Sequence, residues 1–324
     1  MRPLPSAYEQ ENPRQDAGRL AGRDVHPALV SVIVIFLNAE RFISEAIESV
    51  IGQSYSTWEL ILVDDGSADG SSTIARAYAD RRSNITYVEH PGHGNLGTGP
   101  SRNLGITQAR GNYVAFLDSD DVWLPRKLEE QVALLDQEPD VGMIYGVSEI
   151  WYGWSGNASD LARDHVQKLG LPSGERIAAT DMIMSLFVTQ SATVPSICSV
   201  LLRSDAIGDG DWFPHEFRGP YEDQALYARF ITAGPVIGYD RCWDRYRQHG
   251  SSLTATIGGA GQAYRARLRF IQWLIRFLAR ERMLSVRLRL GLWREATRCR
   301  FGALLSQRQR SGGLRRLAAH GNEE

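Results

Sequence analysis

Cysteine is scarce in this sequence of 324 residues, which contains only Cys198, Cys242 and Cys299. The three are far apart and odd in number, and no Cys-x-x-Cys motif occurs. This spacing argues against a disulfide framework and against a cysteine-based zinc site. We therefore expect three buried apolar thiols in a protein of the reducing cytoplasm.

Long apolar runs are lacking as well. No uncharged apolar run reaches about eighteen residues, the length that a spanning helix needs, so no transmembrane helix is expected. Residues 1–28 are polar, rich in proline and without an apolar stretch. They are not typical of a signal peptide, and we expect a disordered lead-in. With 43% hydrophobic residues, the chain can bury one large core, or a core and a smaller lobe.

The net charge of −2 conceals an uneven distribution of charge. Residues 1–263 contain 34 acidic and 21 basic side chains, a balance of −13, whereas residues 264–324 contain 15 arginines and four glutamates, a balance of +11. Such a division indicates a C-terminal tail with a partner of its own. Nucleic acid is a poor candidate, because the acidic first part of the chain would repel it.

Between the lead-in and the tail, strand patterns alternate with helix patterns. This alternation predicts βαβ units, and therefore an α/β fold with a mostly parallel central sheet flanked by helices and a Rossmann-like first half. The strands are expected at residues 31–37, 60–63, 85–89, 113–117, 141–147 and 235–239, and helices at 178–187 and 223–232 among others.

Two acidic clusters follow two of these strands directly. They are Asp64-Asp65-Gly66-Ser67 and Asp118-Ser119-Asp120-Asp121. Ligands of open α/β sheets bind at the carboxyl ends of the strands. An Asp-x-Asp pair can hold a hard divalent cation, whose coordination is often completed by substrate phosphates. The sequence therefore indicates a nucleotide-diphosphate substrate.

Four motifs in order make the sequence resemble a family 2 glycosyltransferase with a GT-A fold. They are residues 30–38, the Asp64 cluster, Ser101-Arg102-Asn103-Leu104-Gly105 and the Asp118 cluster, and a later Glu222-Asp223 pair fits the family's base motif. The resemblance spans residues 29–150. It implies a glycosyltransferase domain at 29–256, with a nucleotide-sugar half at 29–150 and an acceptor half at 151–256, followed by a basic helical tail at 257–324.

The resemblance also implies roles for the donor-side residues. Asp118 and Asp120 would hold Mn²⁺ or Mg²⁺ on the diphosphate, and Asp118 would also contact the substrate. Asp65 would bind the nucleobase with Asp64 nearby, although both are also ordinary turn residues. Arg102 would contact the diphosphate, with a surface salt bridge as the alternative. A UDP-sugar is the favoured donor.

On the acceptor side, Asp223 resembles the general base that takes the proton from the acceptor hydroxyl, with Glu222 as the rival carboxylate. His249 resembles a histidine that approaches the metal or the diphosphate, but a packed surface histidine fits its sequence equally well. The resemblance implies inverting transfer of a single sugar to a saccharide or lipid-linked acceptor, in cell-surface polysaccharide or glycoconjugate assembly.

Two other functions stay open on the sequence. A strand followed by Asp118-Ser119-Asp120-Asp121-Val122 superficially matches a haloacid-dehalogenase-like phosphatase, but that motif normally sits on the first strand. The third alternative is a non-catalytic sugar-nucleotide-binding protein.

The tail predicts a basic amphipathic helix at residues 264–293. Leu268, Ile271, Ile275 and Leu278 would share one face, with arginines 265, 269, 276 and 280 on the others. Such a helix suits an anionic membrane surface, which would place the protein peripherally on the inner face of the cell membrane. It would equally suit packing on the acidic domain.

Overall fold

The structure, a computed structural model, describes residues 27–208, 210–217, 219–250, 252 and 259–320. Nearly all of the expected lead-in at 1–28 lies outside the described residues. Among the described residues, no helix combines the length and the apolar composition needed to cross a bilayer.

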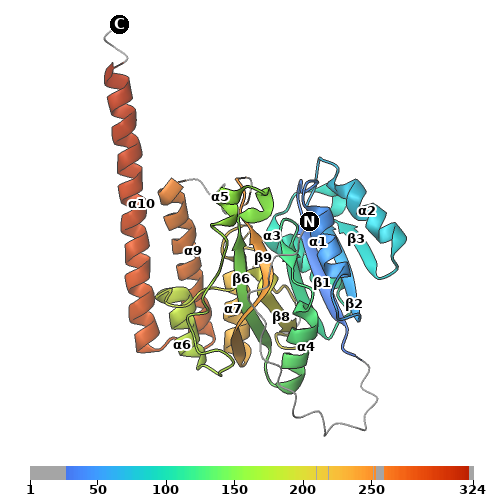
Figure 1. Cartoon of the computed structure of the whole chain (residues 1–324). Helices are drawn as coiled ribbons and strands as arrows, with labels where there is room; N and C mark the ends of the chain where they lie inside the picture. The colour runs from blue at the N-terminus through green and yellow to red at the C-terminus, as the bar shows by residue number, and fades with distance from the viewer. Residues whose placement is uncertain (1–26, 209, 218, 251, 253–258, 321–324) are drawn as a thin grey trace.

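One sheet of nine strands forms the centre of the molecule, in the order β3-β2-β1-β4-β8-β6-β9-β5, with β7 paired to β6 (Figure 1). Strands β1 to β4 pair in parallel. Strand β8 is antiparallel to both β4 and β6, and β9 is parallel to β6. Six strands therefore run in one direction, which confirms the mostly parallel sheet. The strands are β1 Val30–Phe36, β2 Trp58–Asp64, β3 Ile85–Glu89, β4 Tyr113–Asp118, β5 Val122–Trp123, β6 Met143–Trp151, β7 His165–Val166, β8 Val200–Arg203 and β9 Val236–Arg247.

Helices flank this sheet because their apolar residues recur every three or four positions. In α1, for example, Ile43, Ala46, Ile47 and Val50 are buried. The expected helix at 178–187 is present as α6, which continues into a π-helical turn at Met184–Val188. The helices are α1 Ile43–Ile51, α2 Ser71–Arg81, α3 Thr98–Gln108, α4 Lys127–Gln137, α5 Ala158–Leu161, α6 Ala179–Ile183, α7 Glu222–Ala233, α9 Gly259–Arg280 and α10 Val286–His320.

The tail differs from its prediction, because it forms two helices instead of one. Helix α9 ends at Arg280, and α10 runs back alongside it and extends beyond it (Figure 1). In α9, Phe270, Ile271, Leu274 and Leu278 are fully buried and belong to the core that contains the sheet. The expected apolar face of residues 264–293 lies in α9, where it packs on the domain. This face is therefore not available to a membrane.

Candidate active site

Arg102 joins two carboxylates that are far apart in the sequence. It lies on α3, and its guanidinium nitrogens are 2.7 Å from Asp118 Oδ1 at the end of β4 and 2.7 Å from Glu222 Oε1 at the start of α7. Burial alone would lower the pKa of Arg102, but the charges of Asp118 and Glu222 raise it above its ordinary value. Arg102, which is predicted to contact the diphosphate, is thus paired through both terminal nitrogens with carboxylates of the protein.

Asp120 and His249 meet at the same edge of the sheet. His249, which follows β9, has Nε2 2.9 Å from Asp120 Oδ2. Its ring lies 4.9 Å from that of Phe42 and edge-on to Trp154. Burial and the charge of Asp118 raise the pKa of Asp120. The sequence pointed to both residues without indicating that they touch.

Asp121 is deeply buried beside Cys198. Its Oδ1 accepts the Arg247 backbone N–H at 2.8 Å, and its Oδ2 accepts the Cys198 thiol at 3.2 Å. Burial and the charges of Asp120 and Asp118 raise the pKa of Asp121 well above its usual range. Cys198 was expected to be an inert buried thiol, and no local pattern places it here; β8, which the sequence analysis missed, follows its short turn.

These acidic residues fit a divalent cation. Three potential ligand atoms lie within 4.8 Å of one another, one each from Asp118, Asp121 and Cys198. Asp120 lies on the same loop as Asp118 and Asp121. Carboxylates crowded into a site where burial and mutual repulsion raise their pKa gain from a bound cation. Oxygen donors suit Mg²⁺ and Mn²⁺. Asp121 is a third carboxylate beside Asp118 and Asp120, and metal binding by that pair stays a prediction.

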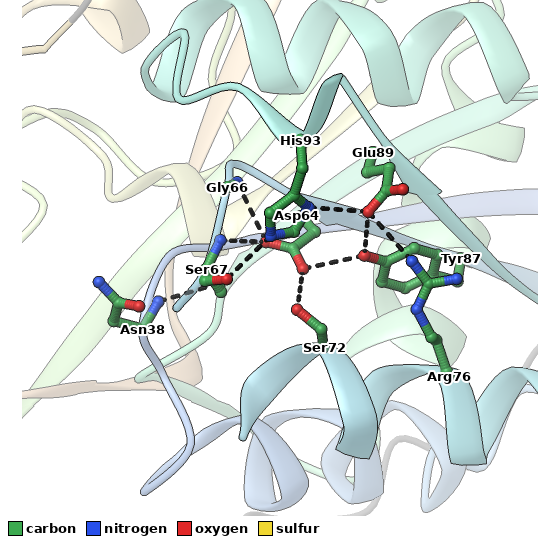
Figure 2. Close-up of polar contacts among 9 residues, drawn as sticks. All are labelled: Asn38, Asp64, Gly66, Ser67, Ser72, Arg76, Tyr87, Glu89 and His93. Atoms are coloured by element: carbon green, nitrogen blue, oxygen red, sulfur yellow. Dashed lines mark hydrogen bonds and ion pairs between the residues drawn. The ribbon is translucent and has the colours of Figure 1, made fainter. Parts of the chain in front are cut away.

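Asp64, at the end of β2, is saturated by hydrogen bonds from the chain (Figure 2). Its Oδ1 accepts the backbone N–H groups of Gly66 and Ser67, and its Oδ2 accepts the hydroxyls of Ser72 and Tyr87. Burial alone would raise the pKa of Asp64, but these hydrogen bonds hold it below its ordinary value. Contact of Asp64 with substrate stays a prediction. In the structure, its carboxylate stabilises the turn at Gly66 and Ser67.

The turn after Asp64 also requires glycine. Gly66 has a φ of +85°, and a Cβ there would lie 2.9 Å from the His93 carbonyl oxygen. His93 bridges the Ser67 carbonyl and Glu89, and both contacts raise its pKa (Figure 2). Asp64, Glu89 and His93 form a second group of clustered ligand atoms.

Asp65 fastens the loop that precedes α3, residues 94–97, to the sheet edge. Its Oδ1 accepts the backbone N–H groups of Leu96 at 2.8 Å and Gly97 at 3.1 Å, and its side chain is almost fully buried. Strands β2 and β4 flank β1 in parallel, so Asp65 and Asp118 lie at the same edge of the sheet, one strand apart. Recognition of a nucleobase by Asp65 stays a prediction.

Asp223 is the second residue of α7, next to the Arg102 network. Glu222 accepts hydrogen bonds from Arg102 and from Thr98 Oγ1, whereas Asp223 accepts only the Gln224 backbone N–H among the described residues. Although Asp223 keeps some exposure, the surrounding protein and the charge of Glu222 raise its pKa to about 7. Of the two rivals, Asp223 is the freer carboxylate.

Arg247 is a further residue that the sequence analysis did not single out. Its guanidinium is buried, donates to the Asp120 carbonyl at 2.6 Å and pairs with Glu45 at 2.5 Å, while its backbone fixes Asp121. The structure thus forms two groups of polar contacts after β4: Arg102 holds Asp118 and Glu222, and His249 holds Asp120.

Comparison with known families fits this geometry. The model of glycosyl transferase family 2 matches residues 31–180, which include the ends of β2 and β4. Residues 31–180 belong to glycosyl transferase family 2. This family 2 region contains both acidic clusters and Arg102, so it favours the transferase over the phosphatase.

Two kinds of relative share this family 2 region or its fold. The UDP-Glc:alpha-D-GlcNAc-diphosphoundecaprenol beta-1,3-glucosyltransferase WfgD of Escherichia coli is 37% identical over 122 residues, 38% of this chain and 46% of that protein. TarS 1–349 of S. aureus with UDP-GlcNAc superposes with a TM-score of 0.59 at 20% identity, over 78% of this chain and 66% of that one. Mannosyltransferase PcManGT from Pyrobaculum calidifontis, with GDP-Man and Mn²⁺, gives 0.55 at 16% identity, over 93% and 82%.

The structural and the sequence similarities support different conclusions. At such low identities the solved structures show a shared fold, and they confirm the GT-A architecture. The chain spans less than half the length of the curated relatives that it matches first.

Proposed function

We propose that this protein transfers a single sugar from a nucleotide-diphosphate-sugar to an acceptor hydroxyl, with inversion, in the assembly of a cell-surface polysaccharide or glycoconjugate. The observation that carries the proposal is the buried Arg102, which joins Asp118, two residues before Asp120, to Glu222 at the start of α7, where Asp223 follows. This arrangement combines groups for a metal–diphosphate with a separate carboxylate of raised pKa.

Each group has a defined task in this proposal. Asp118 and Asp120 would hold Mn²⁺ or Mg²⁺, which when bound neutralises charge on the departing diphosphate. Asp223 takes the proton from the acceptor hydroxyl, because a base must lie within hydrogen-bond reach of it and must be ionisable near neutral pH. Attack opposite the leaving group inverts the anomeric carbon. Arg102 holds Asp118 and the start of α7 together, and it would contact the diphosphate of a bound donor.

We propose a UDP-sugar as the donor, with Asp65 and Asp64 beside the nucleobase and His249 beside the diphosphate. Support comes from TarS, whose structure contains UDP-GlcNAc, while PcManGT contains GDP-Man. The printed name of WfgD includes a diphosphoundecaprenol acceptor, which supports a lipid-linked acceptor here. Such an acceptor would place the enzyme peripherally on the inner face of the cell membrane.

The test is calorimetric titration of the whole chain with a panel of nucleotide-sugars, with Mn²⁺ or with a chelator. We expect one UDP-sugar to bind only with the metal, and Asp120→Ala to abolish this binding. The control is Asp80→Ala, an exposed aspartate on α2. Full binding by the Asp120 variant, with no effect of the chelator, would refute the metal-dependent site. Binding without any donor turnover would favour the non-catalytic alternative.

A further inference from the structure

Helix α10 carries most of the exposed large apolar side chains of the described chain. Ten such side chains are exposed among the residues whose side chains the structure describes, and four of them, Leu37, Leu96, Leu161 and Val166, are scattered over the domain. The other six lie within the first twenty residues of α10 and are 52–75% exposed. They are Val286, Leu290, Trp293, Phe301, Leu304 and Leu305.

These six residues form a stripe along one side of the helix. Positions 286, 290, 293, 301 and 304 recur at the spacing of one helix face, and Leu305 lies at its edge. The opposite side of α10 holds Leu288, Leu292, Ala296 and Cys299, all buried. The helix therefore has one apolar face that packs on the protein and a second that faces outward. We refer to the six exposed residues as the α10 stripe.

Arginines border the α10 stripe on both sides. Arg287, Arg289, Arg294, Arg298 and Arg300 are all exposed. The one acidic residue between positions 286 and 306, Glu295, is buried and pairs with Arg267 and Arg298. Arg289, Arg294 and Arg300 have no ion pair with any described residue. The outward side of this helix is thus apolar along its middle and positive along its margins.

A groove of about 750 Å³ continues the stripe toward the domain. It lies between α10 and the π-helical turn, with Met184, Val188 and Leu290 among its apolar lining. Arg287, Arg294 and Arg298 also line it. An apolar floor with guanidinium groups beside it suits an acyl chain and the phosphate of a lipid headgroup.

We propose that the α10 stripe docks on the surface of an anionic lipid bilayer. Exposed leucine, tryptophan and phenylalanine on one face, with arginine at its margins, is the composition of a helix that lies in the bilayer interface. Each arginine near an anionic surface contributes to binding, whereas two copies of α10 packed together would oppose arginine to arginine. Of the amphipathic helix expected at residues 264–293, the apolar face in α9 is buried, so the proposed surface lies on α10 instead.

This inference extends the proposed function, and its test does not depend on sugar transfer. The full chain is co-sedimented with vesicles of phosphatidylcholine alone and of phosphatidylcholine with phosphatidylglycerol. We expect binding to the anionic vesicles that weakens with added salt. Leu290→Ser with Trp293→Ser should lower the partition coefficient at least about tenfold, since each side chain loses its apolar burial. Leu161→Ser, which is equally exposed at 52% on α5, should leave it unchanged.

A second pair of variants tests the charge. Arg289→Gln with Arg300→Gln should weaken binding to anionic vesicles about thirtyfold, at roughly 1 kcal/mol per arginine. Arg81→Gln with Arg82→Gln changes the net charge equally near the end of α2 and should have little effect. Donor binding should persist in all four variants, which separates a failed docking surface from a failed transferase. Equal sedimentation with neutral and anionic vesicles would overturn the proposal, as would a stripe variant that turns a dimer into a monomer without changing vesicle binding.

Discussion

Phe270 of α9 stacks on Tyr221, the residue that precedes α7, with ring centroids 5.2 Å apart and an angle of 12° between the planes. Tyr221 has a φ of +79°, a conformation that non-glycine residues rarely adopt and that persists only when neighbouring structure enforces it. Arg267 of α9 reinforces the contact by donating to Gln224. The C-terminal tail therefore helps to position the helix start that carries Asp223.

Replacing Phe270 by leucine should affect both stability and turnover. We expect the free energy of unfolding to fall by about 1–3 kcal/mol, and turnover of the donor to fall more than donor affinity, because Tyr221 loses the ring that holds it. Phe230→Leu is the matched control, since Phe230 is equally buried on α7 but packs on Trp212. The positional role would be rejected if both variants lost turnover only in proportion to their stability, as measured by denaturant titration and steady-state kinetics.

Asp223→Asn should remove the general base while leaving the donor site intact. We expect unchanged affinity for the nucleotide-sugar and a turnover lower by roughly 10²–10⁴-fold, the usual contribution of a positioned acid or base. Glu222→Gln should instead weaken donor binding, because Glu222 anchors Arg102. Normal transfer by Asp223→Asn together with an inactive but donor-binding Glu222→Gln would reverse the assignment.

The raised pKa of Asp223 predicts a specific pH dependence. A base must be ionised to accept a proton, and burial with the charge of Glu222 raises the pKa of Asp223 to about 7. The value of kcat/KM should therefore fall as the pH decreases through about 7 and level off above it. Asp223→Asn should lose this acidic limb, so a pH profile with an unchanged limb in that variant would assign it to another group.

Asp64→Asn should destabilise the protein. The carboxylate accepts four hydrogen bonds. In asparagine an NH₂ group replaces one oxygen, so it would face at least one N–H or O–H group that now donates to Asp64. We expect a loss of about 1–3 kcal/mol in the free energy of unfolding, against little change for Asp80→Asn on the exposed side of α2. If Asp64→Asn is as stable as the wild type but binds the donor poorly, Asp64 is a substrate ligand and not the anchor of its turn.

The parallel half of the fold was predictable because its signals are local. Strands β1 to β4 are short apolar runs, and the acidic clusters mark where two of them end. Strand β8 was missed because four residues between irregular segments give no periodic signal. The break in the tail at residues 281–285 was missed because arginine and apolar residues continue on both sides of it.

The candidate site was predictable residue by residue but not in its contacts. Local motifs pointed to Asp118, Asp120, Arg102 and Asp223, yet no sequence pattern pairs Arg102 with Glu222, 120 positions away. The thiol of Cys198 beside Asp121 arises from tertiary packing of the same kind. Such contacts depend on the order of strands in the sheet, which periodicity does not encode.

The most direct test of the account is the stereochemistry of donor cleavage. With Mn²⁺ and a UDP-α-sugar that binds, slow transfer to water can be followed by proton NMR before the free sugar equilibrates between its anomers. An inverting enzyme that uses Asp223 as base should release the β-anomer first, and Asp223→Asn should suppress its appearance. Initial release of the α-anomer by the wild-type protein, or β-anomer formation at the full rate by the variant, would contradict the central claim.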